Sequence, residues 1–492
     1  MEKLKKLLEY QQEIANIQYT INLLGWELKI STPEKAEQDL IALMTNYESK
    51  LFSLQTSDYY GELLNEVVSS EEFQNIEEAE RRYISKLLKN YEENKKIPSD
   101  FYEKYTELRS KSNVVWKSAK EQNNYQMFKP YLEQIIDMTK QLYRYIDCET
   151  DNLYDVMLNN YEIGMTSDVI DRLFDELKQR LLPMIPKESE QLIPNGEYTY
   201  TNQELIECAQ FLLEYMGFDL KRGTLGIYPH GFTDKMNQND IRIAFRNVND
   251  PFDFLTTIIH EGGHGILEQN ISENLSRYEN ATIDNLYGLH ESQSRFYENI
   301  LGRNINFWIP IYDEISKRLR LNISLDKFME ILNHPVPNVK RIESDELTYC
   351  MHIILRYEIE RAIFNECVSL DELPNLWNQK MKDYLGIEVK NDSDGLMQDI
   401  HWSEGDFGYF PSYLLGTIYD GMFIQAVEKD LGNLDELLKA GRIKDITDYL
   451  INNIYKNGGA YTSTEIINRM CGSEISVDPI ANYFEKKYSK TK

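Results

Sequence analysis

The run His260-Glu261-Gly262-Gly263-His264 places two imidazoles and a carboxylate where they can act on one metal ion. On a helix, residues four positions apart share a face, so His260 and His264 can bind the same ion. Glu261 lies beside them and can accept a proton from a water molecule that the ion activates. Such a pattern is rare by chance in a chain with only seven histidines. We therefore predict a catalytic metal site rather than a chance pattern on a solvated helix.

The helix that carries this motif has a clear start and an unusual interior. Asp250 can cap its first turn, and Pro251 suits the first helical position, where no backbone N–H is needed. Gly262, Gly263 and Gly265 lie in the interior, where each glycine costs about 1 kcal/mol relative to alanine. We expect another backbone to approach closely at these glycines, either an extended substrate or a neighbouring strand.

A catalytic zinc site usually has three protein ligands, so one more must come from elsewhere in the chain. A second predicted helix, residues 283–301, contains His290 and Glu291. Adjacent helical side chains point about 100° apart, so only one of the two can bind comfortably. We favour Glu291 as the third ligand and expect His290 to lie beside the metal or to face the substrate. Glu268 and Glu298 are weaker candidates.

A third predicted helix, residues 344–366 with Ser344 as its cap, carries a polar stripe. The stripe follows one helical face and comprises Asp345, Tyr349, His352 and Arg356. We favour a cleft wall over a solvated stripe, because tyrosine and histidine occur there between apolar flanks. Arg356 could bind a carboxylate through two parallel hydrogen bonds. Asp345 could instead orient a metal-binding histidine.

A segment rich in glycine and tyrosine, residues 395–413, contains His401, Tyr409 and Tyr413. Neutral tyrosine and histidine donors can stabilise the oxyanion that develops during peptide hydrolysis. The same residues would also suit an aromatic loop packed against the core, and the local sequence does not separate the two interpretations.

The rest of the chain predicts a large, mainly helical protein. Apolar residues recur every three or four positions, as in 71–95, and only 14 of the 492 residues are proline. Sequence typical of β-strands is confined to residues 197–201, 226–228 and 241–245, which indicates a small β element. No linker, repeat or low-complexity tract divides residues 1–492, so we expect a single domain.

Composition excludes several classes of protein. The chain has 53 Lys and Arg against 81 Asp and Glu, and its net charge of −28 disfavours binding to nucleic acid or to anionic membranes. No stretch has the character of a signal peptide or a membrane span. Five scattered cysteines without a CxxC pair fit a reducing compartment. We expect a cytoplasmic protein that has no catalytic cysteine.

The order and spacing of six short segments resemble the motifs of the carboxypeptidase Taq family of metallocarboxypeptidases. These segments are His230-Gly231-Phe232, Asp240-Ile241-Arg242-Ile243-Ala244, His260-Glu261-Gly262-Gly263-His264, His290-Glu291-Ser292-Gln293, Ile342-Glu343-Ser344-Asp345 and residues 395–402. Residues 1–229 carry no such motif. Two positions depart from the family pattern, since Gly231 replaces a usual proline and Ala244 a usual threonine. Neither is a metal ligand, so the departures concern the shape of the substrate groove.

The resemblance implies a metallopeptidase that removes single residues from the free C-terminus of peptides. It implies Zn²⁺ as the metal, which Co²⁺ can replace, and a homodimer. It also implies a mainly helical, two-lobed fold around a deep substrate groove, similar to neurolysin and angiotensin-converting enzyme, with the small β element near the active site.

Matching motifs also imply a role for each candidate residue. The metal ligands and the general base would be His260, His264, Glu291 and Glu261. The residues that contact the substrate would be Arg242, Arg356, Gln398, His230, His290 and Tyr413. Arg242, Arg356 and Gln398 are the candidates for gripping the terminal carboxylate. His401 and Tyr409 would be the oxyanion donors, with Tyr413 as an alternative.

Two other functions remain open on the sequence. A zinc oligoendopeptidase shares the helical metal motif and the groove, but it would also cleave peptides with an amidated C-terminus. A non-enzymatic, metal-stabilised binding protein would not need Glu261. If a carboxylate must enter the site, we expect a local positive pocket near Arg242 and Arg356 within the acidic surface.

Overall fold

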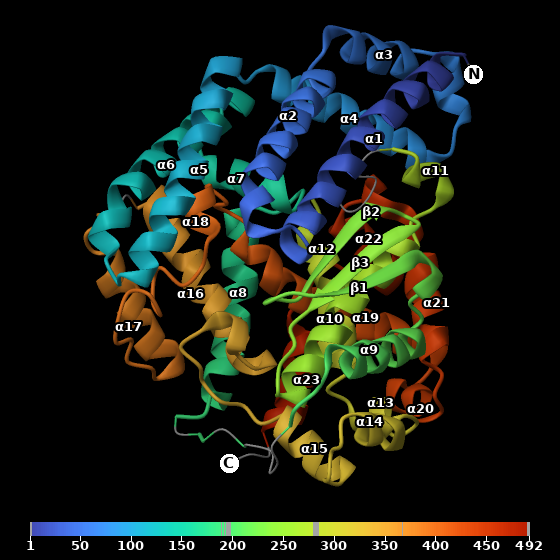
Figure 1. Ribbon diagram of the computed structural model, residues 1–492, viewed down its shortest axis with the longest axis vertical. Helices are drawn as coiled ribbons and strands as arrows, with labels where there is room; N and C mark the ends of the chain where they lie inside the picture. Colours follow the sequence, from blue (N-terminus) through green and yellow to red (C-terminus); the bar gives the residue numbers. More distant parts are fainter. Residues whose placement is uncertain are drawn as a thin grey trace.

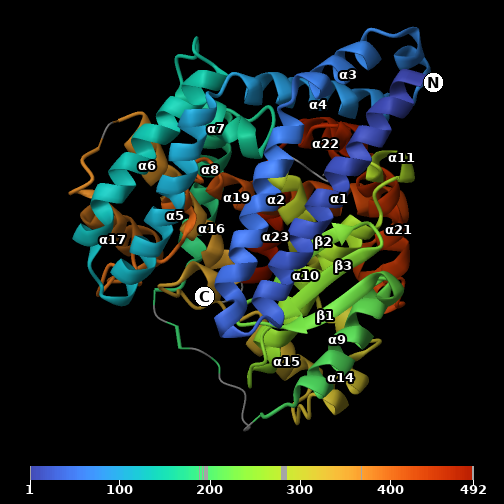
Figure 2. The same ribbon diagram turned by 45° about the horizontal axis from the view of Figure 1, so that its top comes forward.

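The computed structural model shows a mainly helical protein with one small sheet, as the sequence predicts (Figure 1, Figure 2). It describes residues 2–187, 189–190, 192, 198–278, 285–366 and 368–489. Across these ranges no helix combines the length and the apolar character that a membrane crossing requires.

The N-terminal helices lie along the top and the left of Figure 1. They are α1 (Glu2–Ile30), α2 (Glu37–Gln55), α3 (Asp58–Val68), α4 (Glu78–Lys95), α5 (Ser99–Glu121), α6 (Tyr125–Ile146), α7 (Leu153–Tyr161) and α8 (Ser167–Leu181). α8 shows why they form. The side chain of Thr166 caps it by accepting a hydrogen bond from the backbone N–H of Val169. Its larger buried residues recur at helical spacing and are Ile170, Leu173, Phe174, Leu177 and Leu181.

The strands in the described residues form a single sheet. They are β1 (Gly223–Ile227), β2 (Phe232–Asn237) and β3 (Asp240–Phe245), in the order β1-β3-β2. β3 pairs parallel with β1 and antiparallel with β2. β1 and β3 agree with the strands predicted around 226–228 and 241–245. β2 was not predicted, because Phe-Thr-Asp-Lys-Met-Asn lacks clear alternation. The strand predicted at 197–201 is wrong for 198–201, which forms none, and residue 197 lies outside the described residues.

The metal-motif helix packs against this sheet. α9 (Asn202–Met216) precedes the sheet, and α10 (Pro251–Gln269) follows it and lies against β3. The predicted start of α10 is confirmed, since the side chain of Asp250 accepts hydrogen bonds from the backbone N–H groups of Phe252 and Asp253.

Helices make up the rest of the chain. They are α11 (Glu273–Ser276), α12 (Tyr287–Arg295), α13 (Ile305–Trp308), α14 (Tyr312–Arg318), α15 (Leu325–Leu332), α16 (Glu346–Phe364), α17 (Leu373–Leu385), α18 (His401–Glu404), α19 (Phe410–Leu431), α20 (Leu434–Lys439), α21 (Ile443–Asn453), α22 (Ser463–Cys471) and α23 (Asp478–Tyr488). The helix predicted at 283–301 begins at Tyr287 and continues as the π-helical segment Phe296–Leu301; residues 283 and 284 lie outside the described residues. α16 is capped by Asp345 rather than by Ser344, because the Asp345 side chain accepts hydrogen bonds from two backbone N–H groups.

One cluster of buried apolar side chains extends from Leu7 to Tyr488. A smaller cluster, formed by Trp26, Met236 and Ala244, joins α1 to the outer face of the sheet.

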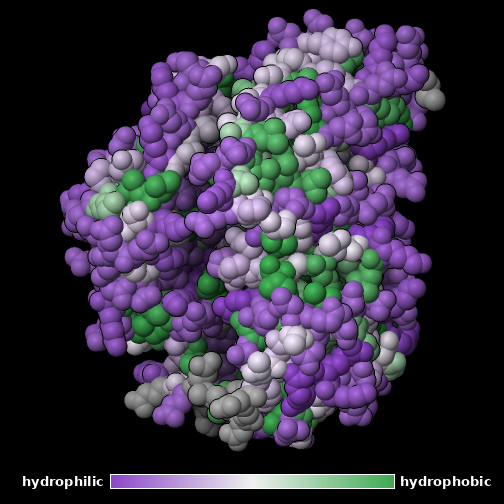
Figure 3. All heavy atoms as spheres, viewed as in Figure 1, coloured by the Kyte–Doolittle hydropathy of each residue, from purple (hydrophilic) through white to green (hydrophobic). Residues whose placement is uncertain are grey.

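The single domain expected for residues 1–492 stays a prediction. The face shown in Figure 3 is hollowed between the part with α5, α6 and α17 and the part with the sheet.

Two glycines bring the central helices into backbone contact. A Cβ at Gly263 of α10 would lie 2.7 Å from the Cα of Ser294 in α12. A Cβ at Gly416 of α19 would lie 2.9 Å from the backbone nitrogen of Ser292, also in α12. The predicted approach of a backbone at Gly263 is therefore confirmed, although the neighbour is a helix. Side chains, not a backbone, approach the other two glycines of α10. Leu213 and Met216 of α9 lie nearest to Gly262, and Phe218 and Ile243 lie nearest to Gly265.

We predict that Gly263→Ala destabilises the protein. The new methyl group would meet main-chain atoms of α12, which cannot move aside as a flexible side chain can, and overpacking of this kind costs about 1–3 kcal/mol. Thermal unfolding of the metal-loaded protein measures the effect. Gly25→Ala in α1 is the matched control. Its nearest neighbour would be the Cε of Met44 at 3.6 Å, so it should gain helix propensity and not lose stability. Equal melting temperatures for both variants would contradict the prediction.

Candidate metal centre

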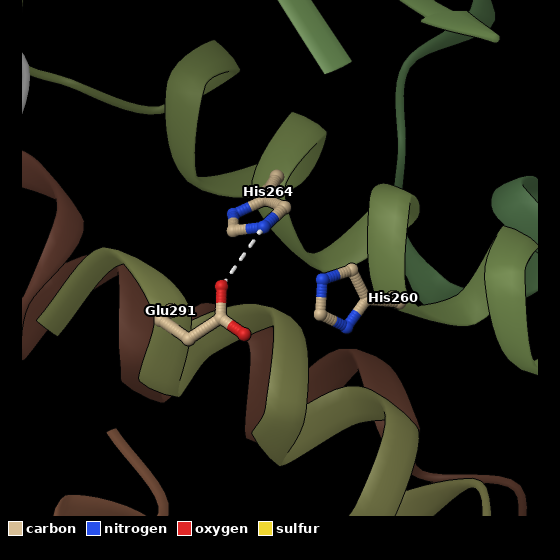
Figure 4. Close-up of side chains that lie close together, drawn as sticks. All are labelled: His260, His264 and Glu291. Carbon is tan, nitrogen blue, oxygen red and sulfur yellow. Dashed lines mark ion pairs between the residues drawn. The ribbon is translucent and has the colours of Figure 1, made fainter. Parts of the chain in front are cut away.

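Three side chains from two helices converge at one point. His260 and His264 extend from α10 and Glu291 from α12, and each offers a ligand atom within 4.8 Å of the others (Figure 4). Among the described residues, this is the one group of three or more His, Cys, Asp or Glu side chains that meets so closely. The structure thus brings together the three ligands that the sequence predicts.

The separation of these atoms suits a bound divalent ion. His264 Nε2 lies 3.6 Å from Glu291 Oε2, which is too long for a hydrogen bond. Two ligands of a tetrahedral zinc ion would lie about 3.4 Å apart, given bonds of about 2.1 Å. Two imidazole nitrogens and one carboxylate oxygen are also a typical catalytic zinc set, which leaves a fourth position for water.

Glu298 orients the first histidine. Its Oε2 lies 2.8 Å from the Nδ1 of His260, so the other ring nitrogen is left for the ion. Burial alone would raise the pKa of Glu298, but the hydrogen bond and charge of His260, together with the charges of Arg303 and Arg295, lower that pKa to about 2. The side chain considered a weaker ligand therefore contacts a ligand instead.

Arg295 holds the carboxylate ligand from the opposite side. Its Nε donates a 2.7 Å hydrogen bond to Glu291 Oε1. The other oxygen, Oε2, faces His264 and is left for the ion. The guanidinium is buried 4.0 Å above the ring of Tyr349. Sequence reasoning missed Arg295, although its position four residues after Glu291 on one helix was an available signal.

His290 lies beside a ligand, one of the two places that the sequence predicts for it. Its ring stacks on that of His264, with centroids 4.4 Å apart. Its Nε2 lies 3.0 Å from Glu268 Oε1, and Lys235 Nζ lies 3.0 Å from the other oxygen of Glu268. Glu268 is thus bound by His290 and Lys235 and is not one of the three candidate ligands.

The predicted general base lies against the sheet. Glu261 is buried, and its Oε2 accepts a 2.7 Å hydrogen bond from the hydroxyl of Thr233 in β2. Burial raises the pKa of Glu261 above that of a free glutamate. His230, one of the predicted substrate contacts, is exposed and packs its ring 6.0 Å from that of Tyr228.

The structure does not bring Arg242 to the ligands. Both its Nε and its Nη2 bond to the carboxylate of Asp240, at 3.0 and 2.9 Å. In the sheet Arg242 pairs with Asp234, whereas Thr233 pairs with Ile243. Neighbours on a strand point to opposite faces, so Arg242 faces α1 and Thr233 faces α10. The expected positive pocket near Arg242 is therefore not supported.

Arg356 is also unsuited to bind a substrate. Its side chain is 0% exposed, and it bonds to Asp399 at 2.7 Å and to the carbonyl of His352 at 2.8 Å. The polar stripe of α16 forms no open cleft wall, because Tyr349, His352 and Arg356 are all buried. The predicted cleft wall is wrong because α16 is packed on nearly every side, and its polar groups bond to one another and to loops.

The local positive charge lies around Asp399, which is bonded by Arg356 and by Arg341, a residue that sequence reasoning missed. The Nε of Arg341 donates to Asp399 Oδ1 at 3.0 Å and its Nη1 to the hydroxyl of Tyr349 at 2.8 Å. Arg341 and Arg356 thus share one carboxylate, which leaves an excess positive charge. They hold the pKa of Asp399 far below its usual range, although burial alone would raise it. The guanidinium of Arg341 lies 4.9 Å from the ring of Tyr413.

Gln398 supports this arginine and does not face a substrate. Its side-chain oxygen accepts a 2.9 Å hydrogen bond from the backbone N–H of Arg341. Its amide nitrogen donates to the carbonyls of Val339 and Asp394, at 3.1 and 2.9 Å. We conclude that Gln398 fixes the loop that carries Arg341.

The structure brings the predicted oxyanion donors together. The ring of Tyr409 lies 5.2 Å from those of His401 and Tyr413, and His401 Nε2 is 3.4 Å from the Tyr413 hydroxyl. Burial, Tyr413 and the nearby carboxylate of Glu291 raise the pKa of Tyr409 well above its ordinary value. The phenol therefore stays neutral and able to donate, and the cluster lies close to a predicted metal ligand.

Glu360 holds the segment that carries these donors. Its carboxylate accepts hydrogen bonds from the indole of Trp402 at 2.8 Å and from the backbone of Gly408 at 2.9 Å. A third comes from the hydroxyl of Tyr154 at 2.8 Å. Trp402 directly follows His401, and Gly408 directly precedes Tyr409. One buried carboxylate on α16 therefore fixes the chain next to both donors.

Known proteins resemble this chain over nearly its whole length. A family model described as carboxypeptidase Taq (M32) metallopeptidase matches residues 6–488. Carboxypeptidase 1 of Bacillus subtilis is 37% identical over 99% of this chain and 98% of its own length. Thermostable carboxypeptidase 1 of Thermus thermophilus is 30% identical with the same coverage. The solved structure of the M32 carboxypeptidase from Deinococcus radiodurans R1 covers 100% of this chain and 99% of its own, with a TM-score of 0.94 and 25% identity.

We predict that Glu360→Gln alters the pH dependence of stability. Burial raises the pKa of Glu360 from 4.5 to about 7, so between these values the folded protein keeps a proton that the unfolded chain releases. The stabilisation from this group is complete below about pH 4.5 and falls as the pH rises towards 7. Urea unfolding from about pH 5 to pH 8 should show the stability difference, wild type minus variant, decreasing and then levelling off. Glu13→Gln, at an exposed position, is the control. A pH-independent difference for Glu360→Gln would refute the prediction.

Proposed function

Since the chain belongs to the carboxypeptidase Taq family of metallopeptidases, it is a metal-dependent carboxypeptidase, and we propose how its own residues carry out this hydrolysis. The observation that carries the proposal is the convergence of His260, His264 and Glu291, with Glu261 beside them. The two relatives and the solved structure named above are carboxypeptidases, and they favour neither an oligoendopeptidase nor a non-enzymatic binding protein.

We propose that His260, His264 and Glu291 hold a Zn²⁺ ion, which Co²⁺ can replace. When bound, such an ion lowers the pKa of a water molecule towards 7 and polarises the peptide carbonyl. Glu298 and Arg295 keep one ligand from each helix in the orientation that binding needs, and this supports a site that is formed in advance.

Glu261 is the proposed general base. Its carboxylate takes the proton of the attacking water and then delivers it to the amine of the leaving residue. His401 and Tyr409 donate hydrogen bonds to the developing oxyanion, and Tyr413 is the alternative donor. The neutral state of the tyrosines and the shared contacts of the three rings support this assignment.

The substrate's terminal carboxylate is proposed to bind at Arg341. The excess positive charge of the Arg341–Asp399–Arg356 group, next to Tyr413, supports this choice. Of the two arginines that the sequence favoured, Arg242 is paired with Asp240, and Arg356 is completely buried behind the same Asp399.

We also propose a cytoplasmic homodimer that acts on peptides with a free C-terminus. The unpaired cysteines Cys148, Cys208, Cys350 and Cys471 are consistent with a reducing compartment. The dimer rests on the family resemblance, and light scattering of the purified protein tests it.

Glu261→Gln should retain the metal and lose turnover. The amide has nearly the shape of the carboxylate but cannot take up the proton, and general-base catalysis contributes about 10²–10⁴-fold. Product masses over time give kcat, and atomic absorption gives the metal content. A fully active Glu261→Gln enzyme would overturn the assignment.

Recognition of the terminal carboxylate should depend on Arg341. The wild-type enzyme should shorten a peptide stepwise from its free C-terminus and leave the amidated peptide intact. Arg341→Met should raise KM for the free acid by about 10- to 100-fold, because a hydrogen bond to a charged group contributes about 1.5–3 kcal/mol. Arg242→Met is the comparison variant. If Arg242→Met raised KM and Arg341→Met did not, the carboxylate site would have to lie elsewhere.

A further inference from the structure

The hydroxyl of Thr233 touches the catalytic glutamate directly. Its Oγ1 lies 2.7 Å from Glu261 Oε2 and 3.0 Å from the backbone carbonyl oxygen of the same residue. A hydroxyl has one hydrogen, and the shorter contact to the charged acceptor is the stronger. We infer that Thr233 is a positioning residue for the general base, an inference that rests on the proposed role of Glu261.

The strand places this hydroxyl accurately. β2 runs beside α10, and its alternate side chains Thr233 and Lys235 both reach that helix. Lys235 Nζ lies 3.0 Å from Glu268, two helical turns beyond Glu261 on the same face. β2 is thus attached to α10 at two carboxylates, and a side chain on such a strand is held more precisely than one on a loop.

The other oxygen of Glu261 is confined by the main chain. A Cβ at Gly231 would lie 3.1 Å from Glu261 Oε1 and 2.5 Å from Thr257 Cγ2. Glycine therefore leaves just enough room for both side chains, at the position where the family resemblance leads one to expect proline. The carboxylate is held at Oε2 by a hydrogen bond, while Oε1 remains to take up the proton.

This arrangement should affect turnover more than binding. A glutamate without the bond would sample other rotamers, and a displacement of about 1 Å at a reacting group can reduce the rate about 100-fold. Among the described residues the hydroxyl of Thr233 bonds to Glu261 and not to the ligand side chains or the Arg341 group, so KM and metal content should not change. A purely structural tie between β2 and α10 would instead alter stability and metal binding together.

The test compares Thr233→Val, which keeps the shape, with Thr233→Ser, which keeps the hydroxyl, in the zinc-loaded enzyme. We expect kcat to fall about 10- to 100-fold for valine and less than about threefold for serine, with KM and zinc content unchanged. Thr256→Val is the matched control, because its hydroxyl bonds only to backbone carbonyls of its own helix. If Thr233→Val does not fold, Thr233→Ala against Thr233→Ser isolates the same oxygen atom.

A double variant separates this inference from the proposed function. If Thr233 acts through Glu261, adding Thr233→Val to Glu261→Gln should cause no further loss. An undiminished kcat for Thr233→Val, an equal loss in both backgrounds, or a crystal structure of Thr233→Val with an unmoved carboxylate would each overturn the inference. Full activity of Glu261→Gln alone would instead overturn the proposed function.

Discussion

The site depends on the contact of three helical backbones. His260 and His264 lie on α10 and Glu291 on α12, so their atoms can meet only if the two helix axes come unusually close. Gly263 permits this on one side of α12 and Gly416 of α19 on the other. Interiors are packed to nearly crystalline density, so main-chain contacts of this kind leave little freedom to slide. The distance between the ligands is therefore a property of the core.

Around this contact, three of the reactive side chains are each held by a second polar group. Glu298 holds His260, Arg295 holds Glu291, and Thr233 holds Glu261. The oxyanion donors are held in the same way, through Glu360 at both ends of their segment. Partners that are buried and already bonded need little reorganisation when a substrate arrives, and this is how preorganised sites lower a barrier.

Sequence reasoning worked where chemistry and local spacing coincide. The capped helix with His260 and His264, and Glu291 as the partner that meets them, follow from periodicity and ligand chemistry. The proposed terminal-carboxylate site could not be found this way, because Arg341 and Arg356 differ only in how the chain folds around Asp399. Arg356 looked accessible on a helical stripe but lies inside a helix packed on nearly every side. Similarly, β2 has no alternating pattern, and it forms because β3 and α10 provide its neighbours.

The place of Gly416 late in the chain also bears on how the protein is made. α10 and α12 leave the ribosome well before α19. α19 packs against the other side of α12, and it begins directly after Tyr409. Until α19 is in place, His260, His264 and Glu291 belong to helices whose spacing is not yet set. A nascent chain should therefore not acquire its metal while it is being synthesised, and metal uptake should follow folding rather than guide it.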